Sequence, residues 1–204
     1  MRFKLHLASA AVYFLLTGVL VHPVFAESKP VSPLGPSYKV QKVIDGNTIQ
    51  LLNGERVRLI GVNVSTFDNQ EHNQKSASDL KLEFENFKKM AGKSQGFLKK
   101  LVEKNEVFLV FDPADQSADH KDREGNILAY VYGKGKTEQY VAYSISLWTR
   151  TYEKLADKMN HLNVNATMIQ AGYGFVNAKY PFKRKKDFDQ LQEEAKKSKI
   201  GIWQ

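Results

Sequence analysis

Short apolar segments alternate with turn residues along much of the chain and predict β-strands. The first hairpin is the clearest, because Asn53-Gly54 separates two such segments and both of its residues tolerate positive φ. Five short strands with these turns predict a small antiparallel barrel. The five segments are Tyr38–Ile44, Thr48–Leu52, Glu55–Leu59, Glu106–Phe111 and Ile127–Tyr132.

Other segments repeat their apolar residues at helical spacing. Such helices interleaved with strands predict an α+β fold. The short helix Asn165–Ala171 is expected to end at Gly172. The other predicted helices are Ser94–Glu103 and Lys185–Lys199, one around Leu80, Phe84 and Phe87, and one around Leu147, Leu155, Met159 and Leu162.

The first 26 residues have the pattern of a signal peptide. Arg2 and Lys4 precede the apolar stretch 7–21, and Val24-Phe25-Ala26 places small residues at both cleavage positions. A membrane anchor is the alternative, but the stretch is shorter than the roughly 20 residues that a spanning helix needs, and His22-Pro23 ends it. We therefore expect an exported protein, periplasmic or secreted, without a stable membrane anchor after cleavage.

Composition narrows the partners and the chemistry. Residues 27–37 are rich in proline and serine and predict a flexible linker before one domain, 38–204. The chain has no cysteine, which excludes disulfides, thiolate metal sites and lipidation of an N-terminal cysteine. Without Arg2 and Lys4 of the predicted signal peptide, the formal net charge falls from +8 to +6, which favours polyanionic partners or anionic surfaces; solubility alone is the alternative.

The order of these elements and their motifs resembles the staphylococcal nuclease (thermonuclease) family. The resemblance implies a five-stranded oligonucleotide-binding (OB-fold) barrel with three core helices. Two stretches, about 69–93 and 137–162, have no counterpart in the family pattern and predict helical insertions. The matching pieces are Val43–Thr48, Arg56–Val62, Lys99–Phe111, Asp122–Tyr132, Ala171–Val176 and Ile200–Trp203.

The resemblance also implies a catalytic arrangement. In active family members, two aspartates and a threonine carbonyl hold one calcium ion. A glutamate orients or deprotonates the attacking water, and two arginines neutralise the phosphate. These are the groups that phosphodiester hydrolysis requires.

Most of those residues are replaced in this chain. Asn47 and Asn63 occupy the positions of the two aspartates, and an amide oxygen without negative charge holds a divalent cation much less tightly. Thr66 stands at the position of the glutamate and Asn126 at that of the second arginine. Only Arg58, at the position of the first arginine, is kept. The resemblance therefore implies a nuclease fold that has lost its chemistry and its cofactor.

Three carboxylates leave a route to activity open. Asp45 fits a structural role in an Asx turn or a place beside a metal ion. Asp68 and Glu71 follow Thr66 in a loop and, with Asp45, would rebuild a carboxylate cluster for calcium; exposed loop acids are the alternative. The backbone carbonyl of Val64 would still be available as a ligand. The histidines lack metal-ligand spacing and are expected at the surface; they include His72, His120 and His161.

A basic and aromatic cluster predicts a surface for single-stranded nucleic acid, because cations bind phosphates and aromatic rings stack on bases. A solvated basic loop is the alternative. The predicted binding residues are Lys121, Arg123, Lys179, Tyr180, Phe182, Lys183 and Arg184.

Three hypotheses for the function follow. The first is an exported, non-catalytic module that binds nucleic acid or protein, with no cofactor. The second is a calcium-dependent phosphodiesterase that cleaves DNA or RNA with a rebuilt site. The third is a domain that binds an envelope protein through its two insertions, which are long for plain connections.

Overall fold

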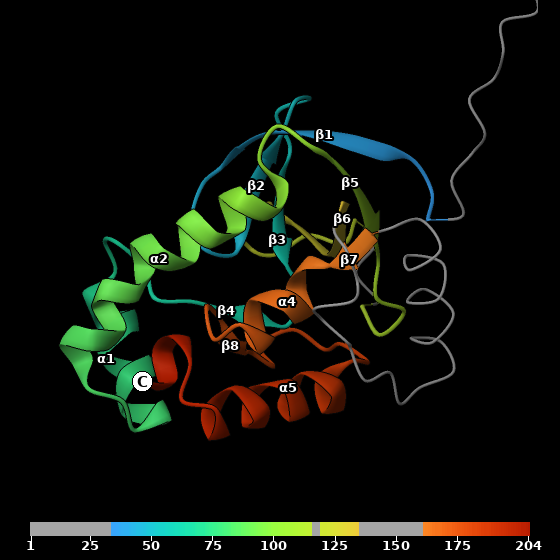
Figure 1. Ribbon diagram of the computed structural model, residues 1–204. Helices are drawn as coiled ribbons and strands as arrows, with labels where there is room; N and C mark the ends of the chain where they lie inside the picture. Colours follow the sequence, from blue (N-terminus) through green and yellow to red (C-terminus); the bar gives the residue numbers. More distant parts are fainter. Residues whose placement is uncertain (1–33, 116–118, 135–160) are drawn as a thin grey trace, which may run out of the picture. The chain divides into compact units, whose positions relative to one another are not determined.

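A computed structural model describes residues 34–115, 119–134 and 161–204 of the chain (Figure 1). The strands are β1 (Ser37–Val43), β2 (Thr48–Leu51), β3 (Arg56–Leu59), β4 (Val62–Asn63), β5 (Glu106–Val110), β6 (Ile127–Lys134), β7 (His161–Asn163) and β8 (Phe175–Val176). The helices are α1 (Gln70–Leu80), α2 (Phe84–Val102), α4 (Val164–Gln170) and α5 (Lys185–Lys197), with a 3₁₀ turn η2 at Gly201–Trp203.

Five strands close into a barrel, in the order β3-β2-β1-β5-β6 and back to β3. All five segments predicted as strands form these strands, which confirms the α+β barrel. The prediction of an antiparallel barrel was wrong at one place, because β3 and β6 pair in parallel, with Arg58 opposite Leu128. Parallel strands need a long crossover, and here the chain between them supplies α1, α2 and β5.

A buried asparagine holds this parallel seam together. Asn165, the second residue of α4, is 0% exposed, and its Nδ2 donates to the carbonyl oxygens of Ile60 at 2.9 Å and Ala129 at 3.1 Å. Its Oδ1 accepts from the backbone N–H of Val131 at 2.9 Å. One side chain therefore bonds backbone groups on both sides of the seam, next to the backbone hydrogen bond from the N–H of Ile60 to the Ala129 carbonyl oxygen at 3.1 Å.

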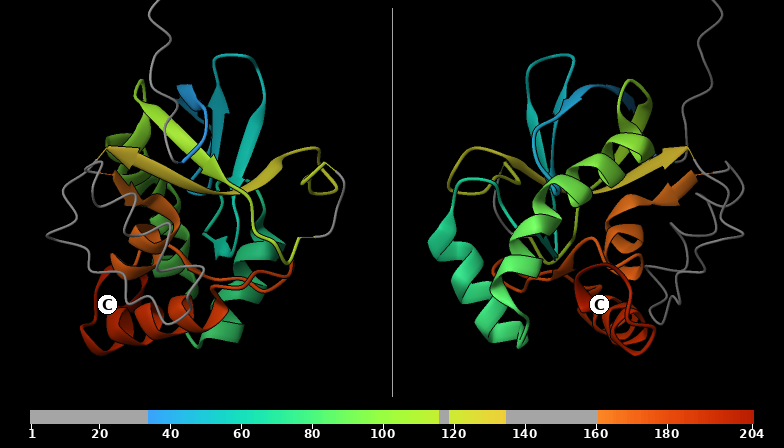
Figure 2. Two further views of the ribbon diagram at one scale, coloured as in Figure 1. Left: turned by 90° about the vertical axis from the view of Figure 1, so that its right-hand side faces the viewer. Right: turned by 60° about the vertical axis from the view of Figure 1, so that its left-hand side comes forward.

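The core has two parts. The larger part fills the barrel and contains the apolar faces of β1 to β6, with Leu98 and Val102 of α2. The smaller part lies among α1, α2, α5, β8 and η2, and consists of Ala77, Phe87, Met90, Phe175, Ala195, Ile202 and Trp203. The helices α1, α4 and α5 gather on one side of the strands, and α2 runs from the strands to these helices (Figure 2).

Several helix boundaries differ from the predictions. The first insertion forms α1 and the first half of α2, so the two helices predicted around Leu80 to Phe87 and at 94–103 are instead α1 and one longer helix, 84–102. Leu162, predicted as helical, lies in β7. The rest of the second insertion, 137–160, and the predicted signal peptide lie outside the described residues.

The predicted linker has an ordered end. Leu34 is 4% exposed and belongs to the larger core cluster, and Ser37 already begins β1. Residues 27–33 lie outside the described residues. Among the described helices, none has the length and apolar character that crossing a membrane would require.

Candidate functional site in the cleft beside α1

A cleft of about 620 Å³ opens between α1 on one side and β3, β4 and β8 on the other. A volume of this size is typical of small-ligand sites. The cleft brings together seven of the residues predicted for the site. They are Asp45, Asn47, Arg58, Asn63, Thr66, Lys179 and Tyr180.

Asn47 is a structural link in the turn before β2. Its Nδ2 donates to the carbonyl oxygen of Val62 at 2.9 Å, and its Oδ1 accepts from the Thr48 hydroxyl at 3.1 Å. The Asp45 carboxylate accepts from the backbone N–H of Asn47 at 2.8 Å, which is an Asx hydrogen bond. An aspartate at position 47 would have no donor for Val62, so its carboxylate would face a carbonyl oxygen.

The other two oxygens at the calcium positions also have partners within the chain. Asn63 Oδ1 accepts from the backbone N–H of Val64 at 3.0 Å. The carbonyl oxygen of Val64 lies 3.0 Å from Nε2 of His72, which projects from α1. His72, predicted as a plain surface residue, is therefore part of the cleft and bonds the very carbonyl that was expected to face a metal ion.

A second α1 residue fixes the loop where the base would be. Asn73 is 1% exposed; its Oδ1 accepts from the backbone N–H of Thr66 at 2.9 Å, and its Nδ2 donates to the Thr66 carbonyl at 2.7 Å. The Thr66 hydroxyl lies 3.3 Å from the Asn69 carbonyl oxygen and 3.3 Å from Asn73 Oδ1. The insertion helix thus holds Val64 to Thr66 in one conformation.

The carboxylates that would rebuild a metal site do not meet in the cleft. Asp45 lines it, whereas Asp68 and Glu71 are exposed and lie outside its lining. Across the three described ranges, no group of three or more histidine, aspartate or glutamate side chains is arranged to hold a metal ion. The donor set beside Asp45 consists of neutral amides and one carbonyl that already accept hydrogen bonds, so the residues present do not fit a calcium ion.

Arg58 is bound by two carboxylates. Its Nη1 lies 2.6 Å from Asp122 Oδ2, and its Nη2 lies 2.8 Å from Glu124 Oε2. Burial acts to lower the pKa of Arg58, but its hydrogen bond to Glu124 and the negative charges of Asp122, Glu124 and Asp45 outweigh burial and raise it. The guanidinium is therefore permanently charged, and two of its five N–H donors already point at carboxylates rather than at an incoming phosphate.

Asn126 supports this ion pair from the barrel side. It is 2% exposed and lies outside the cleft lining; its Nδ2 donates to Asp122 Oδ2 at 3.0 Å, and its backbone N–H donates to Asp122 Oδ1 at 2.9 Å. Burial acts to raise the pKa of Asp122, but these hydrogen bonds and the charge of Arg58 hold it below its ordinary value. Asn126 thus takes the second arginine's position and braces the first.

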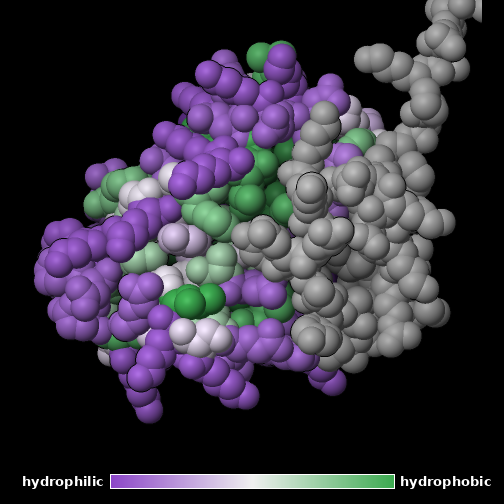
Figure 3. Space-filling model, in the orientation of Figure 1, coloured by the Kyte–Doolittle hydropathy of each residue, from purple (hydrophilic) through white to green (hydrophobic). Residues whose placement is uncertain are grey.

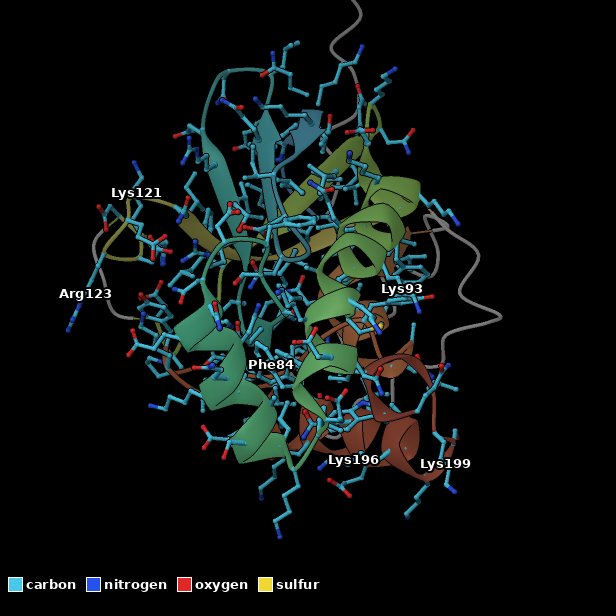
Figure 4. The ribbon with its side chains drawn as sticks, turned by 90° about the vertical axis from the view of Figure 1, so that its left-hand side faces the viewer. Phe84, Lys93, Lys121, Arg123, Lys196 and Lys199 are labelled. Carbon is cyan, nitrogen blue, oxygen red and sulfur yellow. The ribbon has the colours of Figure 1, made fainter. Side chains whose placement is uncertain are left out.

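The predicted nucleic-acid cluster divides into a cleft pair, a peripheral group and a buried pair. Lys179 and Tyr180 line the cleft, with Lys179 Nζ 5.4 Å from the centre of the Tyr180 ring. The exposed Lys121 and Arg123 lie on a loop that points away from the barrel (Figure 4), and Lys183 is also exposed.

Two residues of the cluster were assigned wrongly. Phe182 is 8% exposed and its ring packs on Phe188, and Arg184 is 1% exposed with its guanidinium over the rings of Tyr130 and Phe188. Both belong to the packing under α5. Part of what buries them is distant in sequence, since Gly61 lies against Phe182 and Tyr130 against Arg184, so the local basic and aromatic pattern could not separate them from Tyr180.

The role of α1 in the cleft was not predicted from the sequence. Its turns facing the cleft carry polar residues, and Asn69 caps the helix by accepting from the backbone N–H of His72 at 2.8 Å. Asparagine at this place is a helix-start signal that could have located α1. His161 was also predicted at the surface but is 7% exposed against Phe108. His120, the third, is partly exposed and lies 3.0 Å from Asp115.

Two comparisons with known proteins bear on this site. The family described as staphylococcal nuclease homologue matches residues 56–204. An uncharacterized protein of Methanocaldococcus jannaschii is 26% identical over 175 residues, which cover 81% of this chain and 70% of that protein. The range matched by the family, 56–204, includes Arg58, the α1 insertion and the loop of Asp122.

Proposed function

Since this chain belongs to the staphylococcal nuclease family, we propose that it is a non-catalytic member that binds single-stranded nucleic acid at its cleft. The proposed ligand, nucleic acid, is the class that the family fold suggests, but the protein would bind it without hydrolysing it. It also places the domain outside the cytoplasm, periplasmic or secreted, on the strength of the pattern in residues 1–26.

One observation carries the loss of catalysis. The three oxygens at the calcium positions, on Asn47, Asn63 and Val64, each have a hydrogen-bond partner within the chain. A calcium ion would share each oxygen with the hydrogen-bond donor already there and would gain no charge from two amides and a carbonyl. A missing general base typically costs ~10²–10⁴ in rate, and Thr66, at that position, has its hydroxyl within reach of Asn69 and Asn73.

The cleft keeps features that suit binding. Tyr180 offers a partly exposed ring at the edge of the cleft, and Lys179 and Lys75 add positive charge from opposite walls. Base–aromatic stacking contributes about 1–3 kcal/mol per base and tolerates any sequence. The acids Asp45, Asp79 and Glu124 balance the cations in the cleft, so we expect moderate affinity that depends on stacking as much as on phosphate contacts.

The loss of catalysis is tested by calcium titration and by cleavage. We expect no heat of calcium binding by calorimetry and no calcium-stimulated cleavage of plasmid or single-stranded DNA by the full chain. Purification from a host that lacks periplasmic nucleases removes the main artefact. Cleavage that needs a divalent metal and stops with chelator would refute the proposal and establish the calcium-dependent phosphodiesterase instead.

Nucleic-acid binding is tested with fluorescent single-stranded oligonucleotides. Tyr180→Ala should weaken binding by about 5- to 100-fold, because one stacked base is lost, and Lys179→Gln should weaken it less and reduce its salt dependence. Lys197→Gln, an exposed site outside the cleft, removes the same charge and serves as the control. Equal affinities of the wild type and Tyr180→Ala would reject the cleft as the binding site and favour a protein partner bound through the insertions.

A further inference from the structure

The long helix α2 has a face of five lysines, none of which is in an ion pair among the described residues; Glu83 at the start of the helix interacts electrostatically with one of them, Lys89. We call Lys88, Lys89, Lys93, Lys99 and Lys100 the lysine face. At 100° per residue, the five lie within an arc of about 140°. All five are exposed, and the opposite side of α2 is buried against the core through Phe87, Leu98 and Val102.

The lysine face concentrates the charge of the protein. With five lysines and one acid, Glu85, α2 has a formal charge of +4, against +8 for the whole chain. No ion pair among the described residues involves a lysine of this face, whereas other cations, such as Arg58 and Lys185, have carboxylate partners. Like charges along one helix face destabilise the helix, so the fold itself does not explain this arrangement.

Two glycines of α2 lie within the same arc, and an exposed phenylalanine from the loop before α1 lies beside one of them. Gly92 and Gly96 leave the helix surface bare, and the Phe67 ring lies beside Gly92, 3.9 Å from where a β-carbon would be. Phe67 is 52% exposed, one of the few large apolar side chains that the described chain presents to water. Figure 3 shows hydrophilic residues over much of the surface along α2, and Figure 4 labels Lys93 on it.

From these observations we propose that the lysine face of α2, with Phe67, docks the domain on an anionic phospholipid bilayer. Lysines near a negatively charged membrane surface are attracted by about 1 kcal/mol each, and an aromatic side chain among them enters the headgroup region. The five lysines lie outside the lining of the cleft, so this docking is independent of the proposed ligand.

The features of the face favour a bilayer over nucleic acid. Binding of a single strand needs successive aromatic platforms, but Phe97 is stacked on Tyr173 with ring centres 4.4 Å apart, which leaves Phe67 as the exposed ring. The face also has no arginine, the residue whose planar guanidinium suits bidentate phosphate recognition. Lysines on a convex helix suit a diffuse, laterally mobile layer of negative charge.

The test is sedimentation of the full chain with vesicles of phosphatidylglycerol and phosphatidylcholine, compared with phosphatidylcholine alone. The readout is the difference between the two, because the apolar stretch 7–21 would bind both kinds of vesicle. We expect binding to anionic vesicles that falls steeply with salt. The triple variant Lys89→Gln, Lys93→Gln, Lys100→Gln should lose on the order of 100-fold in affinity.

Matched variants make the result decisive. Lys39→Gln, Lys186→Gln, Lys197→Gln removes the same charge from other exposed sites and should retain most of the binding. Phe67→Ser should weaken binding without changing its salt dependence. Equal losses in both triple variants, or binding that is the same for neutral vesicles, would overturn the proposal. Binding of duplex DNA by the lysine face, together with no binding to anionic vesicles, would also overturn the proposal. None of these results depends on what the cleft binds.

Discussion

Replacing Asp122 with asparagine should lower the free energy of unfolding by about 3–5 kcal/mol at neutral pH, because the change leaves a partly buried guanidinium without its closest carboxylate. The Asp122 side chain is 0% exposed and lies 2.6 Å from Arg58. It also accepts from Asn126 and from the backbone N–H of Glu124 at 2.8 Å. Urea unfolding measures the loss.

Glu124→Gln is the matched control. The Glu124 carboxylate binds the same arginine, but the Glu124 side chain is 65% exposed, so its replacement should cost under ~1 kcal/mol.

The same variant makes a prediction about pH. The pKa of Asp122 is lowered in the folded state, so the carboxylate stabilises the protein above the unfolded pKa of about 3.9. That stability is lost as the pH falls through the folded pKa, below this value. The wild type should therefore lose its advantage over Asp122→Asn only at strongly acid pH. A variant that is no less stable than Glu124→Gln at pH 7 would show that the pair does not support the barrel.

Replacing Gly61 with alanine should lower the free energy of unfolding by about 2–5 kcal/mol, which combines the cost of a left-handed backbone and of overpacking. Gly61 has φ +77°, and an added β-carbon would lie 2.8 Å from two ring carbons of Phe182 and 3.0 Å from Phe188. Since its carbonyl accepts from the backbone N–H of Asn177 at 3.0 Å, the change should also distort the cleft.

Gly125 offers a control for the backbone term. Its φ is +79°, and an added β-carbon would meet nothing within 4 Å, so Gly125→Ala should cost only about 1–2 kcal/mol. The difference between the two variants isolates the crowding under the cleft. Thermal or urea unfolding that gives the same loss for both would mean that Phe182 and Phe188 move aside freely.

The barrel could be predicted from the sequence because its signals are local. Asn53-Gly54 fixes the first hairpin. The alternation of apolar and polar residues in each strand can be read from that segment alone, without its folded neighbours. The parallel seam could not be foreseen in the same way, because the pairing of Arg58 with Leu128 depends on residues about seventy positions apart. The motif order of the family resemblance implied the five-stranded barrel, but the pairing of β3 and β6 in parallel was not predicted.

The site was harder to predict for a physical reason. Local chemistry identified Asn47 and Asn63 as poor metal ligands, but not what their amides do instead, since Val62 and Thr48 become partners only in the folded turn. His72 has no motif of its own, and its place at the Val64 carbonyl follows from how α1 packs. Which partners these side chains bind depends on how they are buried, and their burial depends on contacts between segments that are distant in sequence.

The cleft spans the parallel seam, with Arg58 and Ile60 on one side and Leu128 and Glu124 on the other. Any molecule bound in the cleft contacts both β3 and β6, and separation of these two strands would open the barrel. Its binding energy therefore adds directly to the work of that opening. Amide protons along β3 and β6 would exchange with solvent more slowly when the cleft is filled, so deuterium uptake at the seam reports occupancy for a ligand of any chemical class.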